Sequence, residues 1–188
     1  MLKVLVTGAF STGKSTLVER LASRLGQWCS VALVPDVARR CPFTLNRAQD
    51  EEGTLWLLAK QLSNELEISR DRPDVLLCDR GVPDILAHLE EARTRGAAGV
   101  RPDLLKPFLI EWCRTYELVL VSKIDSRIPT APDHLRIPDH VFRAEMEAHS
   151  DTVLAQLTPS ARALGLSPEE RLHEALDLIQ KALQRNRA

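Results

Sequence analysis

Short apolar runs alternate with longer amphipathic stretches along most of the chain. The runs are about four or five residues long and rich in β-branched valine, which favours buried strands over helices. They predict strands at residues 2–6, 31–34, 75–78 and 118–121, with a weaker candidate at residues 160–164.

The stretches between these runs repeat leucine or isoleucine at the three- and four-residue spacing of a helix. Two helix starts also carry capping signals. Asn46 with Gln49 three residues later resembles a capping pair, and Ser167 with Glu170 encloses a proline suited to the first helical turn. The predicted helices cover about residues 14–25, 46–70, 82–95, 103–115, 139–157 and 168–183.

An α/β fold of three layers follows from this alternation: a parallel sheet of about five strands with helices on both faces. In such a sheet each strand is apolar along its whole length, because helices cover it on both sides. The 188 residues suit one domain, residues 1–188, and neither a repeat nor a linker interrupts them.

The charge balance narrows the classes of partner. The chain has 25 Lys and Arg against 26 Asp and Glu, so its net charge of −1 gives no bulk attraction for nucleic acid or acidic membranes. No apolar run approaches the roughly 18 residues of a membrane span. The cysteines are scattered along the chain, so we expect them to be reduced thiols. We therefore expect a cytoplasmic protein with no nucleic-acid or membrane partner, and a homodimer stays open.

Residues 8–15 fit the pattern G-x-x-x-x-G-K-[ST], between a predicted strand and a predicted helix. The glycines let successive backbone N–H groups turn inward around phosphate oxygens, and the helix N-terminus adds partial positive charge. This segment resembles the phosphate loop, or Walker A motif, of the P-loop NTPase superfamily. The predicted nucleotide-binding residues of the loop are Gly8, Ala9, Phe10, Ser11, Thr12, Gly13, Lys14, Ser15 and Thr16.

The chemistry of such a loop implies ATP and Mg²⁺ as cofactors. Lys14 is expected to reach the β- and γ-phosphates and to act in catalysis, while the Ser15 hydroxyl coordinates Mg²⁺. Asp79 ends the third apolar run, beside the loop. A carboxylate at this position would hold the same metal ion through water.

The residue after Asp79 separates two classes of P-loop protein. Arg80 stands where hydrolytic motors usually place a glutamate that activates water, so a motor is disfavoured. Asp79-Arg80-Gly81 resembles instead the Asp-Arg motif of thymidylate and nucleoside kinases, whose arginine helps to fix the acceptor or the phosphates. The resemblance implies that Asp79 and Arg80 lie against the substrate and that Arg80 is catalytic.

Another carboxylate, Asp36, ends the second apolar run. The carboxyl ends of parallel strands converge, so Asp36 should share a crevice with the phosphate loop and orient or deprotonate an acceptor hydroxyl. Residues 34–40, Val-Pro-Asp-Val-Ala-Arg-Arg, resemble the acidic and Ala-Arg stretch of nicotinamide riboside kinase-like (AAA-type ATP-binding) proteins. The resemblance implies substrate contacts from Asp36, Arg39 and Arg40, with Asp36 catalytic.

Three prolines break the helical pattern over residues 124–138 and predict a loop. Asp133-His134-Leu135-Arg136 resembles the Asp-Gly-Leu-Arg stretch of the same riboside-kinase-like family, with His134 in place of glycine. The resemblance implies a lid segment at about residues 125–145 that closes over the phosphates. In that lid Arg127 would bind nucleotide, Arg136 would be catalytic and Arg143 would begin the next helix.

These patterns predict a small-molecule kinase that moves the γ-phosphate of ATP to a hydroxyl of a nucleoside or riboside. Two alternatives use the same loop. One is a P-loop ATPase or nucleotide-binding regulator without a small-molecule acceptor. The other is a GTPase, because Ser122-Lys123-Ile124-Asp125 resembles the element by which GTPases read guanine.

Overall fold

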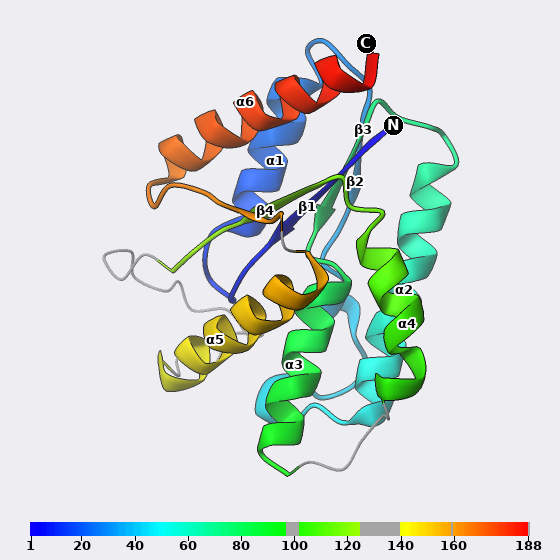
Figure 1. Ribbon diagram of the computed structural model, residues 1–188, viewed down its shortest axis with the longest axis vertical. Helices are drawn as coiled ribbons and strands as arrows, with labels where there is room; N and C mark the ends of the chain where they lie inside the picture. The colour runs from blue at the N-terminus through cyan, green and yellow to red at the C-terminus, as the bar shows by residue number, and fades with distance from the viewer. Residues whose placement is uncertain (97–101, 125–139, 159, 188) are drawn as a thin grey trace.

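The computed structural model describes residues 1–96, 102–124, 140–158 and 160–187 (Figure 1). Within these residues the strands form one sheet of five parallel strands in the order β2-β3-β1-β4-β5. The prediction of a parallel sheet of about five strands is confirmed. The strands are β1 (Leu2–Thr7), β2 (Val31–Val34), β3 (Val75–Asp79), β4 (Leu118–Val121) and β5 (Arg162–Ala163).

Helices cover both faces of the sheet and make the three predicted layers (Figure 1). One face carries α1 (Lys14–Leu25) and α6 (Pro168–Arg187). The other face carries α2 (Glu51–Ser69), α3 (Val82–Thr94), α4 (Pro102–Cys113) and α5 (His140–Leu157). Among the described helices, none is both long and apolar enough to cross a membrane.

The alternation of side chains along β1 gives the molecule two apolar cores. Leu2, Val4 and Val6 are buried against α1 and α6, whereas Leu5 is buried among the helices of the opposite face. β1 lies between β3 and β4, and Val6 is level with Asp79 of β3. The ends of these parallel strands therefore meet at one edge of the sheet, where the phosphate loop begins.

The start of α2 differs from the prediction. The helix begins at Glu51, where the Asp50 carboxylate accepts a hydrogen bond from the backbone N–H of Gly53 at 2.8 Å. Asn46 instead begins the 3-10 turn Asn46–Ala48, with a φ of 62°. Asp50 is the better cap because the acidic residues that follow it also interact favourably with the partial positive charge at the helix N-terminus.

The capping signal at α6 is confirmed. The Ser167 hydroxyl accepts a hydrogen bond from the backbone N–H of Glu170 at 3.2 Å, and the Glu170 carboxylate accepts one from the Ser167 N–H at 3.0 Å. This reciprocal pair satisfies two backbone groups at the helix start.

Candidate functional site

The loop between β1 and α1 has a conformation that depends on its glycines. Gly8 has a φ of 128°, and a Cβ built there would lie 2.3 Å from the backbone oxygen of Ser122. Gly13 caps α1 in the left-handed conformation, with a φ of 82°. Residues with a side chain rarely adopt either backbone conformation, and the backbone of Ser122 leaves no room for a side chain at Gly8.

Side chains from three other parts of the chain hold the carbonyl groups of this loop. Arg171 of α6 donates to the backbone oxygen of Thr12, and Ser122 Oγ donates to the same oxygen at 2.8 Å. Arg143 of α5 donates to the backbone oxygen of Ser11 at 3.0 Å. The C=O and N–H of a peptide unit point in opposite directions. Fixing these carbonyls therefore turns the adjoining N–H groups toward the side that can receive a phosphate.

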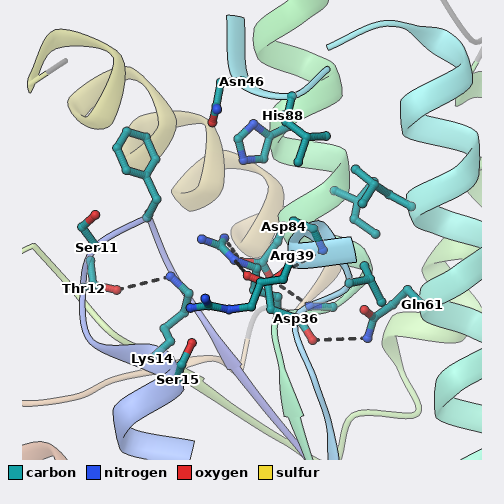
Figure 2. A pocket seen from close by; sticks show the side chains of 18 of the residues that line it. Ser11, Thr12, Lys14, Ser15, Asp36, Arg39, Asn46, Gln61, Asp84 and His88 are labelled. Atoms are coloured by element: carbon teal, nitrogen blue, oxygen red, sulfur yellow. Dashed lines mark hydrogen bonds and ion pairs between the residues drawn. The ribbon is translucent and has the colours of Figure 1, made fainter. Parts of the chain in front are cut away.

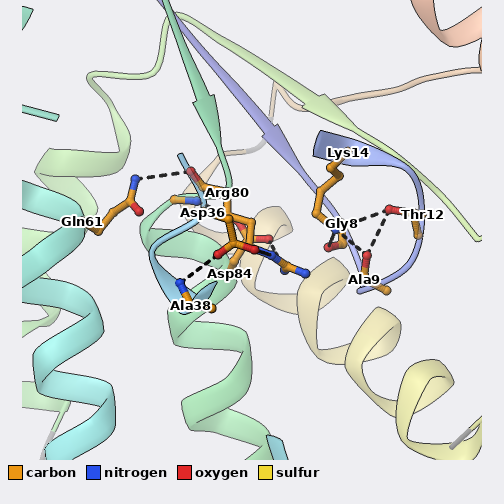
Figure 3. A network of polar contacts seen from close by, with 10 residues as sticks. Gly8, Ala9, Thr12, Lys14, Asp36, Ala38, Gln61, Arg80 and Asp84 are labelled. Atoms are coloured by element: carbon orange, nitrogen blue, oxygen red, sulfur yellow. Dashed lines mark hydrogen bonds and ion pairs between the residues drawn. The ribbon is translucent and has the colours of Figure 1, made fainter. Parts of the chain in front are cut away.

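Lys14 is buried at the first position of α1. Its Nζ donates to the backbone oxygens of Gly8 at 2.8 Å and Ala9 at 2.5 Å (Figure 3). Burial, followed by the positive charge of Arg80, lowers the pKa of Lys14 from its ordinary value to about 7. An anionic ligand in the loop would reverse this shift by stabilising the ammonium form.

Nucleotide binding is therefore expected to draw a proton into the loop. At about pH 8 much of Lys14 is neutral in the free protein, whereas the phosphates of bound ADP favour its charged form, so binding takes up a proton. Calorimetry of ADP binding in two buffers of different ionisation enthalpy measures this uptake. Lys14→Met is the matched control, since it keeps an aliphatic chain but cannot bind the proton. Equal binding enthalpies in the two buffers for the unaltered protein would contradict the expectation.

Asp79 and Ser15 lie together beside the loop. The Ser15 hydroxyl is near enough to favour the charged form of the Asp79 carboxylate, and Asp79 Oδ1 is buried without a hydrogen-bond partner among the described residues. Burial raises the pKa of Asp79, an effect that a nearby cation would reverse. A hydroxyl next to a buried carboxylate with an unused oxygen is a donor set that fits Mg²⁺.

Arg80 connects the ends of two strands and the start of a helix (Figure 3). Its Nε donates to Asp36 Oδ2 at 3.0 Å, and its guanidinium also donates to Asp84 Oδ1 at 3.1 Å. The other oxygen of Asp36 accepts a hydrogen bond from the backbone N–H of Ala38 at 3.0 Å, which caps the 3-10 turn Val37–Arg40. Asp36 and Arg80 are thus bonded to each other beside the phosphate loop, and Asp79 directly precedes Arg80 at the end of β3.

Two residues of α3 enter this site without having been singled out from the sequence. Asp84 is buried, pairs with Arg80 and accepts a hydrogen bond from the backbone N–H of Gly81 at 3.0 Å. His88 lies one turn further along α3, and burial lowers its pKa to about 3, so its imidazole is neutral at neutral pH. The four-residue spacing of Arg80, Asp84 and His88 is the sequence signal that could have identified them.

One cavity joins the phosphate loop to the Asp36–Arg80 pair (Figure 2). Its volume is about 270 Å³, and it runs from Lys14 and Ser15 to residues of α2 and α3. A second cavity of about 170 Å³ adjoins the same loop where α1, α5 and α6 meet, between Arg143 and Pro168. The loop therefore separates two compartments, and Asp36 faces only the first.

Most of the predicted lid falls outside the described residues, including Arg127 and Arg136. Arg143 is described, and it contacts the phosphate loop as stated above. Of the arginine pair that follows Asp36, Arg39 lines the first cavity. Arg40 is exposed and is not among the described residues that line it.

The segment that resembles a guanine-reading element begins directly after β4. Ser122 supports the phosphate loop, and Lys123 Nζ lies 2.6 Å from Asp151 Oδ2 of α5. The backbone oxygen of Lys123 accepts a hydrogen bond from Arg171 at 2.7 Å. Asp125 lies outside the described residues. The described part of this segment thus anchors the loop to α5 and α6.

A family model described as an AAA domain matches residues 3–162, which contain the phosphate loop, Asp36, Asp79 and Arg80. The chain belongs to the AAA domain family. A comparison of this AAA domain with curated proteins finds no match.

Solved structures similar to this AAA domain have kinase-like folds. NadR protein in complex with NR gives a TM-score of 0.69 at 20% identity, over 96% of this chain and 50% of that chain. Thymidylate kinase from Candida albicans gives 0.63 at 16% identity, over 96% and 92% of the two chains. Deoxyadenosine kinase from M. mycoides with bound dCTP gives 0.69 at 12% identity, over 98% and 100%.

The AAA domain spans about half the length of the NadR chains that it matches. At identities this low the TM-scores establish the fold alone, and the fold is that of a P-loop, nucleotide kinase-like protein. The predicted fold class and the predicted resemblance to P-loop kinases are confirmed.

Proposed function

We propose that the chain is an ATP-dependent phosphotransferase that moves the γ-phosphate to a hydroxyl of a small molecule of the nucleoside or riboside class. One observation supports this most strongly: a single cavity is lined both by Lys14 of the phosphate loop and by Asp36 (Figure 2). A protein that only hydrolyses or senses a triphosphate does not need further carboxylate-lined space in the cavity that holds the phosphates.

Different side chains of the cavity have different roles in the proposed reaction. Lys14 and Arg80 stabilise the negative charge that spreads over the transferring phosphoryl oxygens. The guanidinium of Arg80 has five N–H donors, and its contacts with Asp36 and Asp84 use two of them. Asp36 orients the acceptor hydroxyl and takes its proton as the hydroxyl oxygen attacks the γ-phosphorus atom, while the bond from that phosphorus to the β-phosphate oxygen breaks and ADP leaves.

Mg²⁺ held by Ser15 and Asp79 would neutralise charge on the β- and γ-phosphates. Arg127 and Arg136 are proposed to approach the same phosphates from the lid, as the family resemblance implies. Arg39 and Arg40 are proposed to contact the acceptor, and of these two Arg39 lies against the cavity. The use of ATP fits the cytoplasmic location expected from the sequence.

The acceptor end of the cavity combines amide and apolar side chains. Asn46, Gln49 and Gln61 supply hydrogen-bonding groups, while Leu57 and Ile85 supply apolar surface. This mixture suits the base and sugar of a nucleoside, which has both hydrogen-bonding edges and flat apolar faces. The NR and dCTP present in similar structures support the same class of ligand.

An acceptor panel tests the proposal. ADP formation from ATP and Mg²⁺ is measured alone and with each of a set of nucleosides, ribosides and small alcohols. We expect at least one acceptor to raise the rate well above the acceptor-free value. ADP formation that no acceptor increases would overturn the kinase in favour of an ATPase or nucleotide-binding regulator. Turnover with GTP but not with ATP would favour the GTPase alternative.

A further inference from the structure

A buried carboxylate that accepts three hydrogen bonds and pairs with a lysine lies next to Gln61, one of the residues that line the cavity. Glu65 of α2 is 2% exposed. Its Oε1 accepts from Gln61 Nε2 at 2.7 Å and from the Tyr116 hydroxyl at 2.6 Å. Its Oε2 accepts from Trp112 Nε1 at 2.9 Å and lies 2.6 Å from Lys3 Nζ. We call these five residues the Glu65 cluster.

The cluster is built around a buried charge pair. Lys3 comes from the central strand β1, and its Nζ lies 4.8 Å from the centre of the Trp112 ring and 4.6 Å from that of Tyr116. A buried carboxylate is costly unless a cation and hydrogen-bond donors surround it. Hydrophobic residues could fill the same space without that cost. The hydrogen bonds between the Glu65 cluster and other parts of the chain therefore indicate the role of the cluster.

Two members of the cluster reach the backbone directly after Asp79. The second N–H of the Gln61 amide donates to the backbone oxygen of Arg80 at 3.3 Å (Figure 3). The Tyr116 hydroxyl accepts a hydrogen bond from the backbone N–H of Val82 at 3.3 Å. A Cβ built on Gly81, between these two positions, would lie 2.6 Å from the same hydroxyl. The turn at residues 80–82 is therefore packed directly against the Glu65 cluster.

That turn determines the direction of the Arg80 side chain. Arg80 has a φ of 72°. Residues other than glycine rarely adopt this left-handed backbone conformation unless surrounding contacts enforce it. Its backbone N–H donates to the oxygen of Val6 at 3.0 Å, and its guanidinium then lies between Asp36 and Asp84. Release of the carbonyl of Arg80 or the N–H of Val82 would let this backbone relax and the guanidinium turn away.

We propose that Gln61 and Tyr116, both held by Glu65, are positioning residues for Arg80 that act on the turn at residues 80–82. Glu65 orients the Gln61 amide and the Tyr116 hydroxyl, and these two groups hold the left-handed backbone that directs Arg80 toward the reacting phosphate. The inference rests on the proposed phosphotransferase function for its kinetic consequence, but its structural consequence can be measured separately.

Tyr116→Phe and Trp112→Phe form a matched pair, because each removes one hydrogen bond to Glu65 and only Tyr116 also contacts the turn. We expect Tyr116→Phe to lower kcat for phosphoryl transfer by about tenfold or more with an unchanged KM for ATP. Trp112→Phe should leave kcat at the unaltered value. Equal kcat values for the two variants would overturn the proposal, because a purely structural cluster makes no such distinction.

A spectroscopic measurement separates this inference from the proposed function. The Nε–H of Arg80, which donates to Asp36, should give a slowly exchanging signal in arginine side-chain NMR, assigned by its loss in Arg80→Lys. Tyr116→Phe and Gly81→Ala should each shift or broaden that signal, and Trp112→Phe should not. The Gly81 variant disturbs the turn directly, so it provides a test if Tyr116→Phe fails to fold.

If the unaltered protein transfers no phosphate to any acceptor, the proposed function fails while the NMR comparison still tests the inference. An Arg80 signal that stays unchanged in both Tyr116→Phe and Gly81→Ala would overturn the positioning role, whatever the reaction is.

Discussion

Replacing Lys14 by alanine is expected to lower the rate of phosphoryl transfer by about 10³-fold, the effect typical of losing one preorganised donor to developing charge. Lys14 is the buried cation of the phosphate loop, and its Nζ is held at 2.8 Å from the backbone oxygen of Gly8. No solvent-exposed cation can take its place, because the field of a charge in bulk water is strongly reduced.

Initial rates with saturating ATP and acceptor measure this loss, and circular dichroism checks that the fold is intact. Lys181→Ala is the control, because Lys181 is exposed on α6 and pairs with Asp177 of the same helix. This variant should retain full activity. Normal turnover by Lys14→Ala would show that the loop does not hold the transferring phosphate.

Replacing Asp36 by asparagine should slow transfer by about 10²- to 10⁴-fold, the contribution typical of a general base. Affinity for ATP should change little, because the hydrogen bonds of Asp36 go to Ala38 and Arg80 rather than to the phosphate loop. The asparagine keeps an oxygen that can accept a hydrogen bond from Ala38, but it cannot take a proton. Stopped-flow or quench measurements of a single turnover would report the chemical step itself.

Two further variants separate the roles of Asp36. Asp36→Glu retains a carboxylate, so it should recover part of the rate lost in Asp36→Asn. Asp84→Asn removes the other carboxylate that pairs with Arg80. This variant should slow transfer less than Asp36→Asn does, because Asp84 does not take the proton of the acceptor hydroxyl. Equal losses in Asp36→Asn and Asp84→Asn would mean that Asp36 acts only by orienting Arg80. Loss of ATP affinity in Asp36→Asn would place this residue on the donor side.

The sequence predicts best those parts of the molecule that depend on residues close together along the chain. The phosphate loop is a continuous motif, and the run Val31–Val34 became β2 with the predicted bounds. Asp36 and Arg80 could be placed at one edge because strands in a parallel sheet end together. The cap of α2 was harder to predict, because Asn46 and Asp50 both offer local capping signals and only the geometry of the preceding loop decides between them.

Contacts between segments far apart in the chain could not be predicted from spacing. Arg171 looks like one more polar residue on an amphipathic helix, yet it donates to the backbone oxygen of Thr12 in the phosphate loop. Glu65 and Tyr116 lie on different elements, and nothing in either local sequence indicates that they meet at 2.6 Å. Such contacts depend on how helices pack on the sheet, which local patterns do not specify.

The fate of the γ-phosphate distinguishes transfer to an acceptor from hydrolysis. The protein is incubated with γ-phosphate-labelled ATP, Mg²⁺ and an acceptor chosen from the panel, and the label is separated into acceptor ester and inorganic phosphate. We expect most of the label to enter an ester with the acceptor hydroxyl, and Asp36→Asn to form this ester at least about 10²-fold more slowly. Label found only in inorganic phosphate, at a rate independent of the acceptor, would contradict this expectation.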